Sequence, residues 1–165
     1  MEMMLIYDVI IPVYRPDEKL KRLINALLSQ SLLPRRIILI NTEREEFLKF
    51  SPEEEFLAQS PRLKLYHISK AEFNHGATRN YGVSLSDAPF FVCMTDDAIP
   101  AGNTMMEELL MPFSSESIGV SYARQLPDPD CGIIERYTRS FNYPEKERIK
   151  TAKDLPELEL QFFDI

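Results

Sequence analysis

The stretch Tyr7-Asp8-Val9-Ile10-Ile11-Pro12-Val13, closed by a turn at Tyr14-Arg15-Pro16, carries the pattern that predicts the fold of this chain. A short apolar run of this kind is typical of a buried strand in a covered sheet. Asp17 is placed to cap a helix directly after the turn. Apolar residues then recur at helical spacing: Leu20, Leu23, Ile24, Leu27 and Leu28. A strand that leads straight into an amphipathic helix predicts the start of a βαβ unit.

The remaining sequence repeats this alternation of strand and helix. Further strands are predicted at Arg36–Asn41, Leu63–Ile68, Phe90–Met94 and Ile118–Tyr122. Helices are predicted at about Ala77–Leu85, Asn103–Phe113 and Gly132–Phe141, with one or two short helices inside Glu43–Ser60. The closing segment, Leu158–Ile165, has the pattern of the beginning of another strand. Together these elements predict an α/β fold with a mainly parallel sheet flanked by helices.

Composition and charge are those of a folded globular chain. With 165 residues, 44% of them hydrophobic and 27% charged, we expect one domain over residues 1–165. The net charge of -7, without a basic stripe, argues against a nucleic-acid binder. No apolar run reaches the roughly 18 to 20 residues of a membrane span, and the N-terminus lacks the pattern of an export signal. Two cysteines without a CxxC pair and two histidines offer no zinc cluster and favour a cytoplasmic setting.

Polar residues follow the predicted strands at their carboxyl ends, where ligands bind in open parallel sheets. Four loops carry them: Tyr14-Arg15, Asn41-Thr42, Asn74 to Asn80, and Thr95-Asp96-Asp97. Because parallel strands end at the same edge of a sheet, we expect these loops to converge on one rim. That convergence predicts a binding site at this rim.

Two aspartates, Asp96 and Asp97, come directly after a predicted strand. Adjacent carboxylates there are suited to a hard cation such as magnesium or manganese, which would bridge the oxygens of a diphosphate. The alternative is ordinary loop or helix-cap chemistry, for which aspartate is common.

The segment Asn74-His75-Gly76-Ala77-Thr78-Arg79-Asn80 combines a glycine, a helix start and a cation on the first turn. Backbone N–H groups at a helix N-terminus attract phosphate, and Arg79 would add a bidentate contact. In the alternative, Asn74 or Thr78 caps the helix and Arg79 points to solvent. Likewise Tyr14 either stacks on a nucleobase or packs at the strand end, and Asn41-Thr42 either contacts a base or forms the turn.

Four motifs of the chain resemble, in order and spacing, the donor-binding half of family-two glycosyltransferases. They are Val9-Ile10-Ile11-Pro12-Val13-Tyr14, Leu27-Leu28-Ser29-Gln30-Ser31, Phe73-Asn74-His75-Gly76-Ala77-Thr78-Arg79-Asn80 and Met94-Thr95-Asp96-Asp97-Ala98-Ile99-Pro100. The third motif resembles the rhamnosyltransferase branch, as do Arg124-Gln125-Leu126-Pro127 and Phe141-Asn142-Tyr143-Pro144. The resemblance implies a GT-A fold, which is the Rossmann-like fold of nucleotide-diphospho-sugar transferases.

The resemblance also implies an activity: inverting transfer of a sugar from a nucleoside diphosphate to a hydroxyl acceptor. The donor considered is dTDP-rhamnose. The acceptor would be a glycan or a lipid-linked sugar in the synthesis of a cell-surface polysaccharide. The resemblance also implies roles for the candidate residues. Asp97 and Asp96 would bind the metal, and the diphosphate would be bound by Arg79, Asn80, His75 and Gly76. The nucleobase would be bound by Pro12, Tyr14, Asn41 and Thr42. The divalent metal would be Mg or Mn.

The sequence departs from the family pattern in three places. Asn41-Thr42-Glu43 replaces the carboxylate that usually contacts the base, and Thr95-Asp96-Asp97 lacks the first acid of the Asp-x-Asp metal motif. We find no general base in the chain, so we expect a C-terminally incomplete GT-A domain whose isolated form is slow or inactive. We also expect a cytoplasmic protein, peripheral at most at the inner face of the membrane, that forms a homodimer through exposed apolar surface.

Other classes of enzyme fit the sequence less well. A sugar-nucleotidyltransferase needs a glycine-rich loop after the first strand, where this chain has Val13-Tyr14-Arg15-Pro16. The motifs of P-loop NTPases and of serine hydrolases with GxSxG are absent from the sequence. A catalytically inactive nucleotide-sugar-binding or interaction remnant stays open as the non-enzymatic alternative.

Overall fold

A computed structural model describes residues 5–128, 130–147 and 149–154 of the chain. Its residue contacts divide it into two compact units, Met1–Ser121 and Tyr122–Ile165, which we describe separately. The expectation of a single domain over residues 1–165 stays a prediction. In the part of the chain that the structure describes, no helix has the length and apolar character that crossing a membrane requires.

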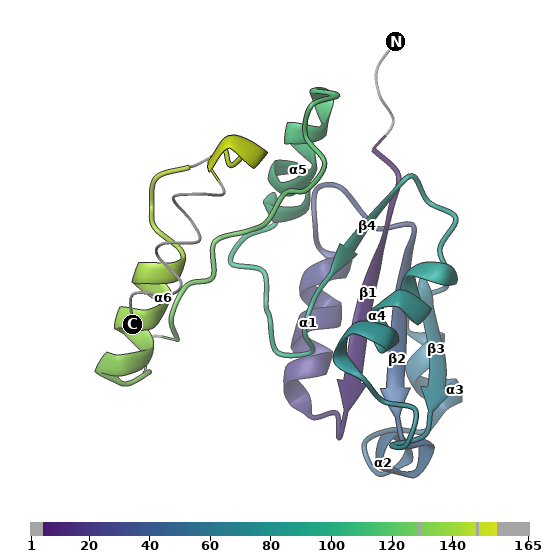
Figure 1. Ribbon diagram of the computed structural model, residues 1–165. Coiled ribbons are helices and arrows are strands. Elements are labelled where there is room, and N and C mark those ends of the chain that lie inside the picture. The colour runs from purple at the N-terminus through teal and green to yellow at the C-terminus, as the bar shows by residue number, and fades with distance from the viewer. Residues whose placement is uncertain (1–4, 129, 148, 155–165) are drawn as a thin grey trace. The chain divides into compact units, whose positions relative to one another are not determined.

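The first unit is built on a four-stranded sheet in the order β3-β2-β1-β4, and all of its pairings are parallel. The strands are β1 (Tyr7–Tyr14), β2 (Arg36–Thr42), β3 (Leu63–Ile68) and β4 (Phe90–Cys93). In Figure 1 these strands run side by side toward one end of the unit. The prediction of a parallel α/β sheet is confirmed, and the first four predicted strands form within one residue of their expected bounds.

One or two helices follow each strand along the chain, as the alternating pattern predicts. They are α1 (Glu18–Leu28), α2 (Arg44–Leu48), α3 (Glu53–Ala58), α4 (His75–Ser84) and α5 (Met105–Leu110), followed by a 3-10 turn, η1 (Met111–Ser114). Asp17 is the N-cap of α1, and its side chain accepts a hydrogen bond from the backbone N–H of Lys19 at 2.7 Å. The segment Glu43–Ser60 holds two short helices, α2 and α3, as predicted. The helix α4 begins at His75, two residues earlier than predicted.

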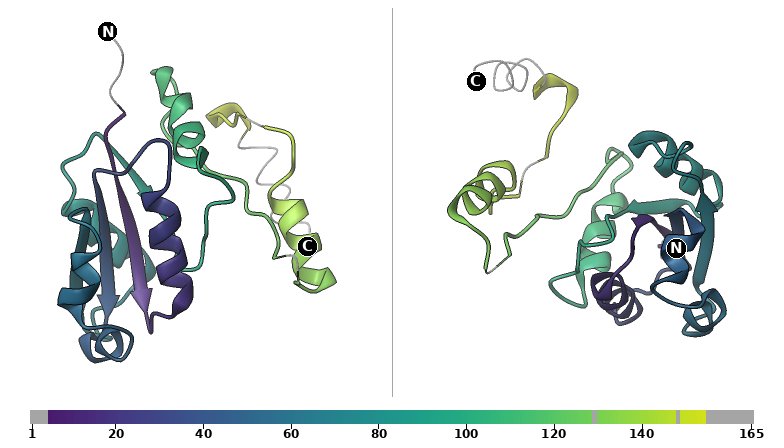
Figure 2. Two further views of the ribbon diagram at one scale, coloured as in Figure 1. Left: turned by 180° about the vertical axis from the view of Figure 1, so that it is seen from behind. Right: turned by 90° about the horizontal axis from the view of Figure 1, so that it is seen from below.

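The two faces of the sheet bury separate apolar clusters. On one face the odd-numbered residues of β1 pack with α1 and with aromatic or aliphatic residues of α2, α3 and α5. On the other face Ile10, Ile38 and Ile40 pack with Val83, near the end of α4. From the front in Figure 1, α4 lies over the sheet, and from behind in Figure 2, α1 does. The sheet is therefore covered on both sides, which explains its nearly continuous apolar strands.

Gly82 allows α4 to approach the sheet closely. A Cβ atom at this position would overlap Cγ2 of Ile10 and would touch Cγ1 of Ile40 at 3.4 Å. The glycine therefore serves helix–sheet packing, and it determines how near α4 and the loop before it lie to β1.

A buried carboxylate, Asp8, ties together three segments near the amino ends of the strands. Arg35 and Arg36 donate to its oxygens at 2.7–3.1 Å, and the hydroxyl of Ser86 donates to Oδ2 at 2.7 Å. Both guanidinium groups also contact Asp87. Burial by itself would raise the pKa of Asp8, but these hydrogen bonds outweigh it and lower the pKa to about 2.

The predicted fifth strand, Ile118–Tyr122, is wrong. Residues 118–122 have no regular secondary structure, and the side chain of Val120 is 81% exposed. The sheet of the described residues has four strands. An apolar alternation becomes a strand only when a neighbouring strand supplies backbone partners, and this segment pairs with none of the described strands.

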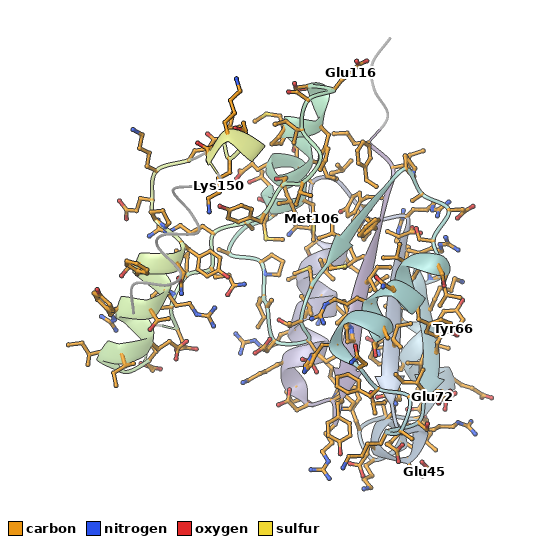
Figure 3. All side chains as sticks on the ribbon, in the orientation of Figure 1. Glu45, Tyr66, Glu72, Met106, Glu116 and Lys150 are labelled. Atoms are coloured by element: carbon orange, nitrogen blue, oxygen red, sulfur yellow. The ribbon has the colours of Figure 1, made fainter. Side chains whose placement is uncertain are left out.

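The second unit contains α6 (Ile133–Asn142) and a short 3-10 turn, η2 (Ala152–Asp154). The predicted helix near Gly132 is thus confirmed, and Arg124 reaches its C-terminal end by donating to the carbonyl of Tyr143 at 3.2 Å. Lys150, labelled in Figure 3, lies 6.0 Å from the ring centre of Tyr122. The strand predicted at residues 158–165 falls outside the described residues.

Candidate functional site

The strand register brings the carboxyl ends of three strands to one edge of the sheet. Tyr14 of β1 lies opposite Thr42 of β2, and Thr42 lies opposite Ile68 of β3. Glu45 of α2 and Glu72 of the loop after β3 are at this end of the unit in Figure 3. The loops that follow β1, β2 and β3 therefore start side by side, at the edge where parallel sheets bind ligands.

The chain after β4 joins the same edge by running along β1. Cys93 lies opposite Ile10, and the backbone N–H of Met94 donates to the carbonyl of Ile10 at 3.0 Å. Thr95, Asp96 and Asp97 come directly after Met94 and lie beside the end of β1. Two loops that are far apart in sequence thus meet.

A hollow of about 170 Å³ marks the meeting point of these two loops. Its lining comes from the turn after β1, the first turn of α1 and the loop after β4: Tyr14, Arg15, Asp17, Lys19, Leu20, Asp96 and Asp97. The structure therefore brings the predicted base-binding Tyr14 to the predicted metal-binding aspartates.

Three carboxylates, those of Asp17, Asp96 and Asp97, line this hollow together with the cations Arg15 and Lys19. Burial raises the pKa of Asp96, and the nearby charges of Asp97 and Asp17 raise it further, while hydrogen bonds from the backbone of Asp96 itself and of Tyr14 oppose the shift. A carboxylate with a raised pKa beside two others is a place where a cation would relieve repulsion.

The fit of a divalent metal can be judged from these donors. Within residues 5–128, 130–147 and 149–154, no group of three or more His, Cys, Asp or Glu side chains is arranged to hold a metal by itself. Magnesium, however, is commonly held by one or two carboxylates together with substrate phosphates and water. Asp96 and Asp97 fit that second arrangement, in which a diphosphate completes the coordination.

The segment before α4 adopts the capped form that the sequence offered as an alternative. Asn74 is the N-cap, and its Oδ1 accepts from the backbone N–H groups of Gly76 at 3.0 Å and Ala77 at 3.1 Å. These two N–H groups are therefore occupied by a side chain in this structure. His75 is exposed and its ring packs edge-on against Phe73, with ring centres 5.1 Å apart.

Arg79 turns back on its own helix instead of extending into solvent. Its Nη1 donates to the carbonyl of His75 at 2.8 Å. Desolvation raises the pKa of Cys93, and the charge of Arg79 opposes that shift, so the guanidinium lies near the last residue of β4. Asn80 is exposed. Arg79 is thus close to the strand that leads into Asp96 and Asp97.

Asn41 and Thr42 are buried at the end of β2, with exposed fractions of 0% and 3%. Alternation along the strand directs them to opposite faces of the sheet. The amide nitrogen of Asn41 donates to the carbonyl of Glu43 and contacts Nδ1 of His67, both at 3.0 Å. Asn41 Oδ1 and Thr42 Oγ1 have no hydrogen-bond partner among the described residues. Both side chains sit beneath the rim, and Pro12, inside β1, is also partly buried.

Three charged residues that line the hollow, Arg15, Asp17 and Lys19, have no assigned role in the predicted site. The sequence predicts Asp17 as a helix cap and places Arg15 beside Tyr14 in one of the four loops of the rim, without a function of its own. Their position directly after a strand, at the carboxyl edge, is the signal in the sequence that points to them.

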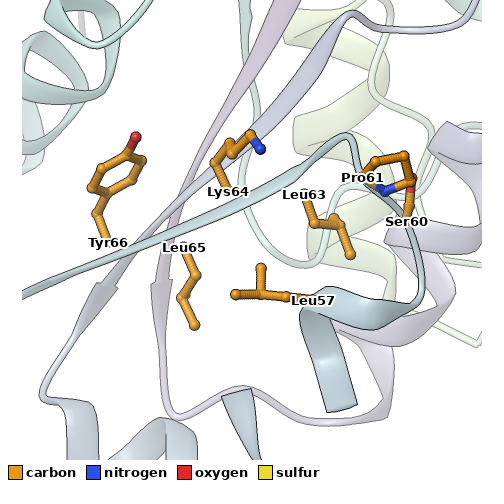
Figure 4. A pocket seen from close by; sticks show the side chains of 7 residues that line it. All are labelled: Leu57, Ser60, Pro61, Leu63, Lys64, Leu65 and Tyr66. Atoms are coloured by element: carbon orange, nitrogen blue, oxygen red, sulfur yellow. The ribbon is translucent and has the colours of Figure 1, made fainter. Parts of the chain in front are cut away.

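A second, larger hollow lies along the outer side of β3 (Figure 4). It has a volume of about 360 Å³ and is lined by Leu57, Ser60, Pro61, Leu63, Lys64, Leu65 and Tyr66. It holds none of the predicted site residues and no carboxylate, so we place the candidate site at the smaller hollow.

Comparisons with known proteins agree with the fold described above. Two curated relatives are each 28% identical to the chain: O-antigen chain rhamnosyltransferase RfbN of Salmonella typhimurium over 151 residues, and O-antigen chain rhamnosyltransferase WbaN of Salmonella anatum over 154 residues. The matches cover 90% and 92% of this chain but 46% and 47% of the relatives. The chain thus spans about half the length of the curated relatives it matches.

Solved structures of S. aureus TarS residues 1–349 share the fold. The structure without a named ligand has a TM-score of 0.54 at 16% identity, covering 74% of this chain and 38% of that chain. The structure in complex with UDP has a TM-score of 0.51 at 16% identity, covering 72% and 39%. The predicted GT-A fold is confirmed. The family described as Glycosyl transferase family 2 matches residues 8–163. The chain therefore belongs to glycosyltransferase family 2.

Proposed function

We propose that this chain binds a nucleoside-diphosphate sugar in the hollow between the turn after β1 and the loop after β4, as the donor-binding part of a glycosyltransferase. The observation that carries the proposal is the meeting of Tyr14 with Asp96 and Asp97 in one hollow at the carboxyl edge of the sheet. Family membership over residues 8–163 supports the reaction class.

In this proposal the ring of Tyr14 stacks on the nucleobase, and Asp97 with Asp96 holds a magnesium or manganese ion against the diphosphate. The bound metal would stabilise the negative charge that develops on the departing diphosphate. Arg79, with Asn80, His75 and Gly76 nearby, supplies the diphosphate side of the site. For Arg79 and Gly76 this requires exchange of the hydrogen bonds to His75 and Asn74 for contacts with the ligand.

The proposed donor is dTDP-rhamnose and the proposed acceptor is a hydroxyl of a glycan or lipid-linked sugar in cell-surface polysaccharide synthesis, with inversion at the anomeric carbon. Two relatives named as O-antigen chain rhamnosyltransferases support this choice. We further propose a cytoplasmic location, peripheral at the inner face of the membrane, and a homodimer.

The sharpest test is calorimetric titration of the chain with dTDP and UDP, with and without manganese. We expect metal-dependent binding that dTDP-rhamnose competes away. Asp97→Asn should weaken that binding by about tenfold or more, because a charged contact to the metal is lost. Glu116→Gln is the matched control, since Glu116 is exposed and lies at the other end of the unit in Figure 3. Equal affinity with and without metal, or no binding of either nucleotide, would contradict the proposal.

The main alternative is a domain that binds the donor without transferring it, since we assign no general base within the chain. Measurable sugar transfer by the isolated chain to a suitable acceptor rules out this alternative. A sugar-nucleotidyltransferase is a weaker candidate, because the turn after β1 carries Arg15 and Pro16 where that class needs glycine.

A further inference from the structure

Arg15 has an unusual backbone conformation at the rim of the candidate site. Its φ is 51°, and it is one of two described non-glycine residues with a positive φ, the other being Glu43. This left-handed region is unfavourable for a residue with a Cβ, and such strain is retained where the surrounding structure uses it. Arg15 directly follows β1 and lines the hollow with Asp96 and Asp97.

The consequence of this conformation is that two neighbouring side chains face each other. In an extended chain, adjacent side chains point to opposite sides, so a guanidinium at position 15 would leave the ring at position 14 uncovered. Here the Cζ atom of Arg15 lies over the ring of Tyr14, 5.0 Å from its centre. A guanidinium within about 6 Å of an aromatic ring centre is attracted to the face of the ring.

The guanidinium also contacts a carboxylate of α2. Its Nε lies 3.3 Å from Oε2 of Glu46, and the second oxygen of that carboxylate contacts Nζ of Lys49 at 2.5 Å. The side chain of Glu46 is 21% exposed, whereas that of Arg15 is 66% exposed. The less exposed carboxylate of Glu46, which Lys49 also contacts, therefore holds the more exposed guanidinium of Arg15 over the ring of Tyr14.

We propose that Arg15 is a positioning residue for nucleobase binding, which clamps one face of the Tyr14 ring so that the other face is ready for a pyrimidine or purine ring. This inference rests on the proposed function, because it assumes that a nucleotide binds at this rim. An immobilised aromatic side chain loses less conformational freedom when a ligand stacks on it, so the clamp raises affinity without touching the ligand. The expected gain is about three- to tenfold.

The test compares UDP with inorganic pyrophosphate, both titrated calorimetrically with manganese, across four forms of the chain. Arg15→Gly removes the guanidinium while placing at this φ the residue that tolerates it best, so the fold should be retained. We expect its affinity for UDP to fall about three- to tenfold and its affinity for pyrophosphate to stay unchanged. Glu46→Ala, which only releases the arginine, should lower UDP affinity in the same direction by a smaller factor.

Glu45→Ala is the matched control, because Glu45 is an exposed neighbour in α2 and is not part of the proposed clamp. Its affinities should equal those of the wild type. An unchanged UDP affinity in Arg15→Gly overturns the clamp, and an equal loss for UDP and pyrophosphate overturns it in favour of a direct diphosphate contact. If the wild type binds neither ligand, the proposed function fails as well, whereas wild-type binding with an unaffected Arg15→Gly refutes the clamp alone.

Discussion

Acid should unfold this protein partly through one residue, Asp8. Its pKa is lowered from 3.8 to about 2, because hydrogen bonds from Arg35, Arg36 and Ser86 outweigh the opposing effect of burial. A carboxyl group whose pKa is lower in the folded state stabilises the fold above its unfolded pKa and loses that effect as the pH falls through its folded pKa. The contribution is about 2 kcal/mol at neutral pH, with about half of it gone by pH 3.

The assay is urea unfolding of the wild type and of Asp8→Asn at several pH values between 7 and 2.5. At pH 7 the variant should be less stable by about 2 to 3 kcal/mol. The side chains of Arg35 and Arg36 are 35% and 26% exposed and keep their contacts with Asp87, so they stay partly hydrated and paired. The difference between the two proteins should shrink below pH 4, because the unfolded wild type takes up a proton at Asp8 near its ordinary pKa of 3.8, whereas the folded protein does so only near pH 2.

Asp87→Asn is the matched control for this experiment. Asp87 contacts the same two arginines, but its side chain is 79% exposed, so its loss should lower the free energy of unfolding much less than the loss of Asp8. A stability difference between wild type and Asp8→Asn that stays constant from pH 7 to pH 2.5 would show that the carboxylate is not the acid-sensitive group.

Two further predictions concern the packing of α4 and the charge of the hollow. Gly82→Ala should lower the free energy of unfolding by about 1 to 3 kcal/mol in chemical denaturation, because its Cβ would overlap Ile10. Gly102→Ala, whose Cβ meets nothing within 4 Å, should stay within about 0.5 kcal/mol of the wild type, and equal effects would refute the close approach. Burial and then the charge of Asp97 raise the pKa of Asp96, so Asp97→Asn should lower that pKa and keep Asp96 charged to lower pH. Carboxyl-carbon NMR titration measures this, and an unchanged pKa for Asp96 would mean that the two groups do not interact.

Local sequence patterns were enough to predict most elements of the first unit. Period-two and period-3.6 patterns, with Asp17 as a cap, give the strands and α1 because each depends on residues close in the chain. The same patterns failed at residues 118–122, because a strand also needs a partner along its edge. The choice at Asn74 between capping α4 and leaving its N–H groups free for phosphate likewise could not be made from composition.

The sequence by itself determined the alternation of strands and helices and the resemblance to its family, since both are carried by spacing along the chain. The parallel register then follows from topology, and it brings Tyr14 to one rim with Asp96 and Asp97. Only the tertiary structure decided that Asp8 joins two arginines and a serine, and that Arg15 folds back over Tyr14. Such contacts depend on the distances between separate segments and on a backbone angle, which residue order alone does not specify.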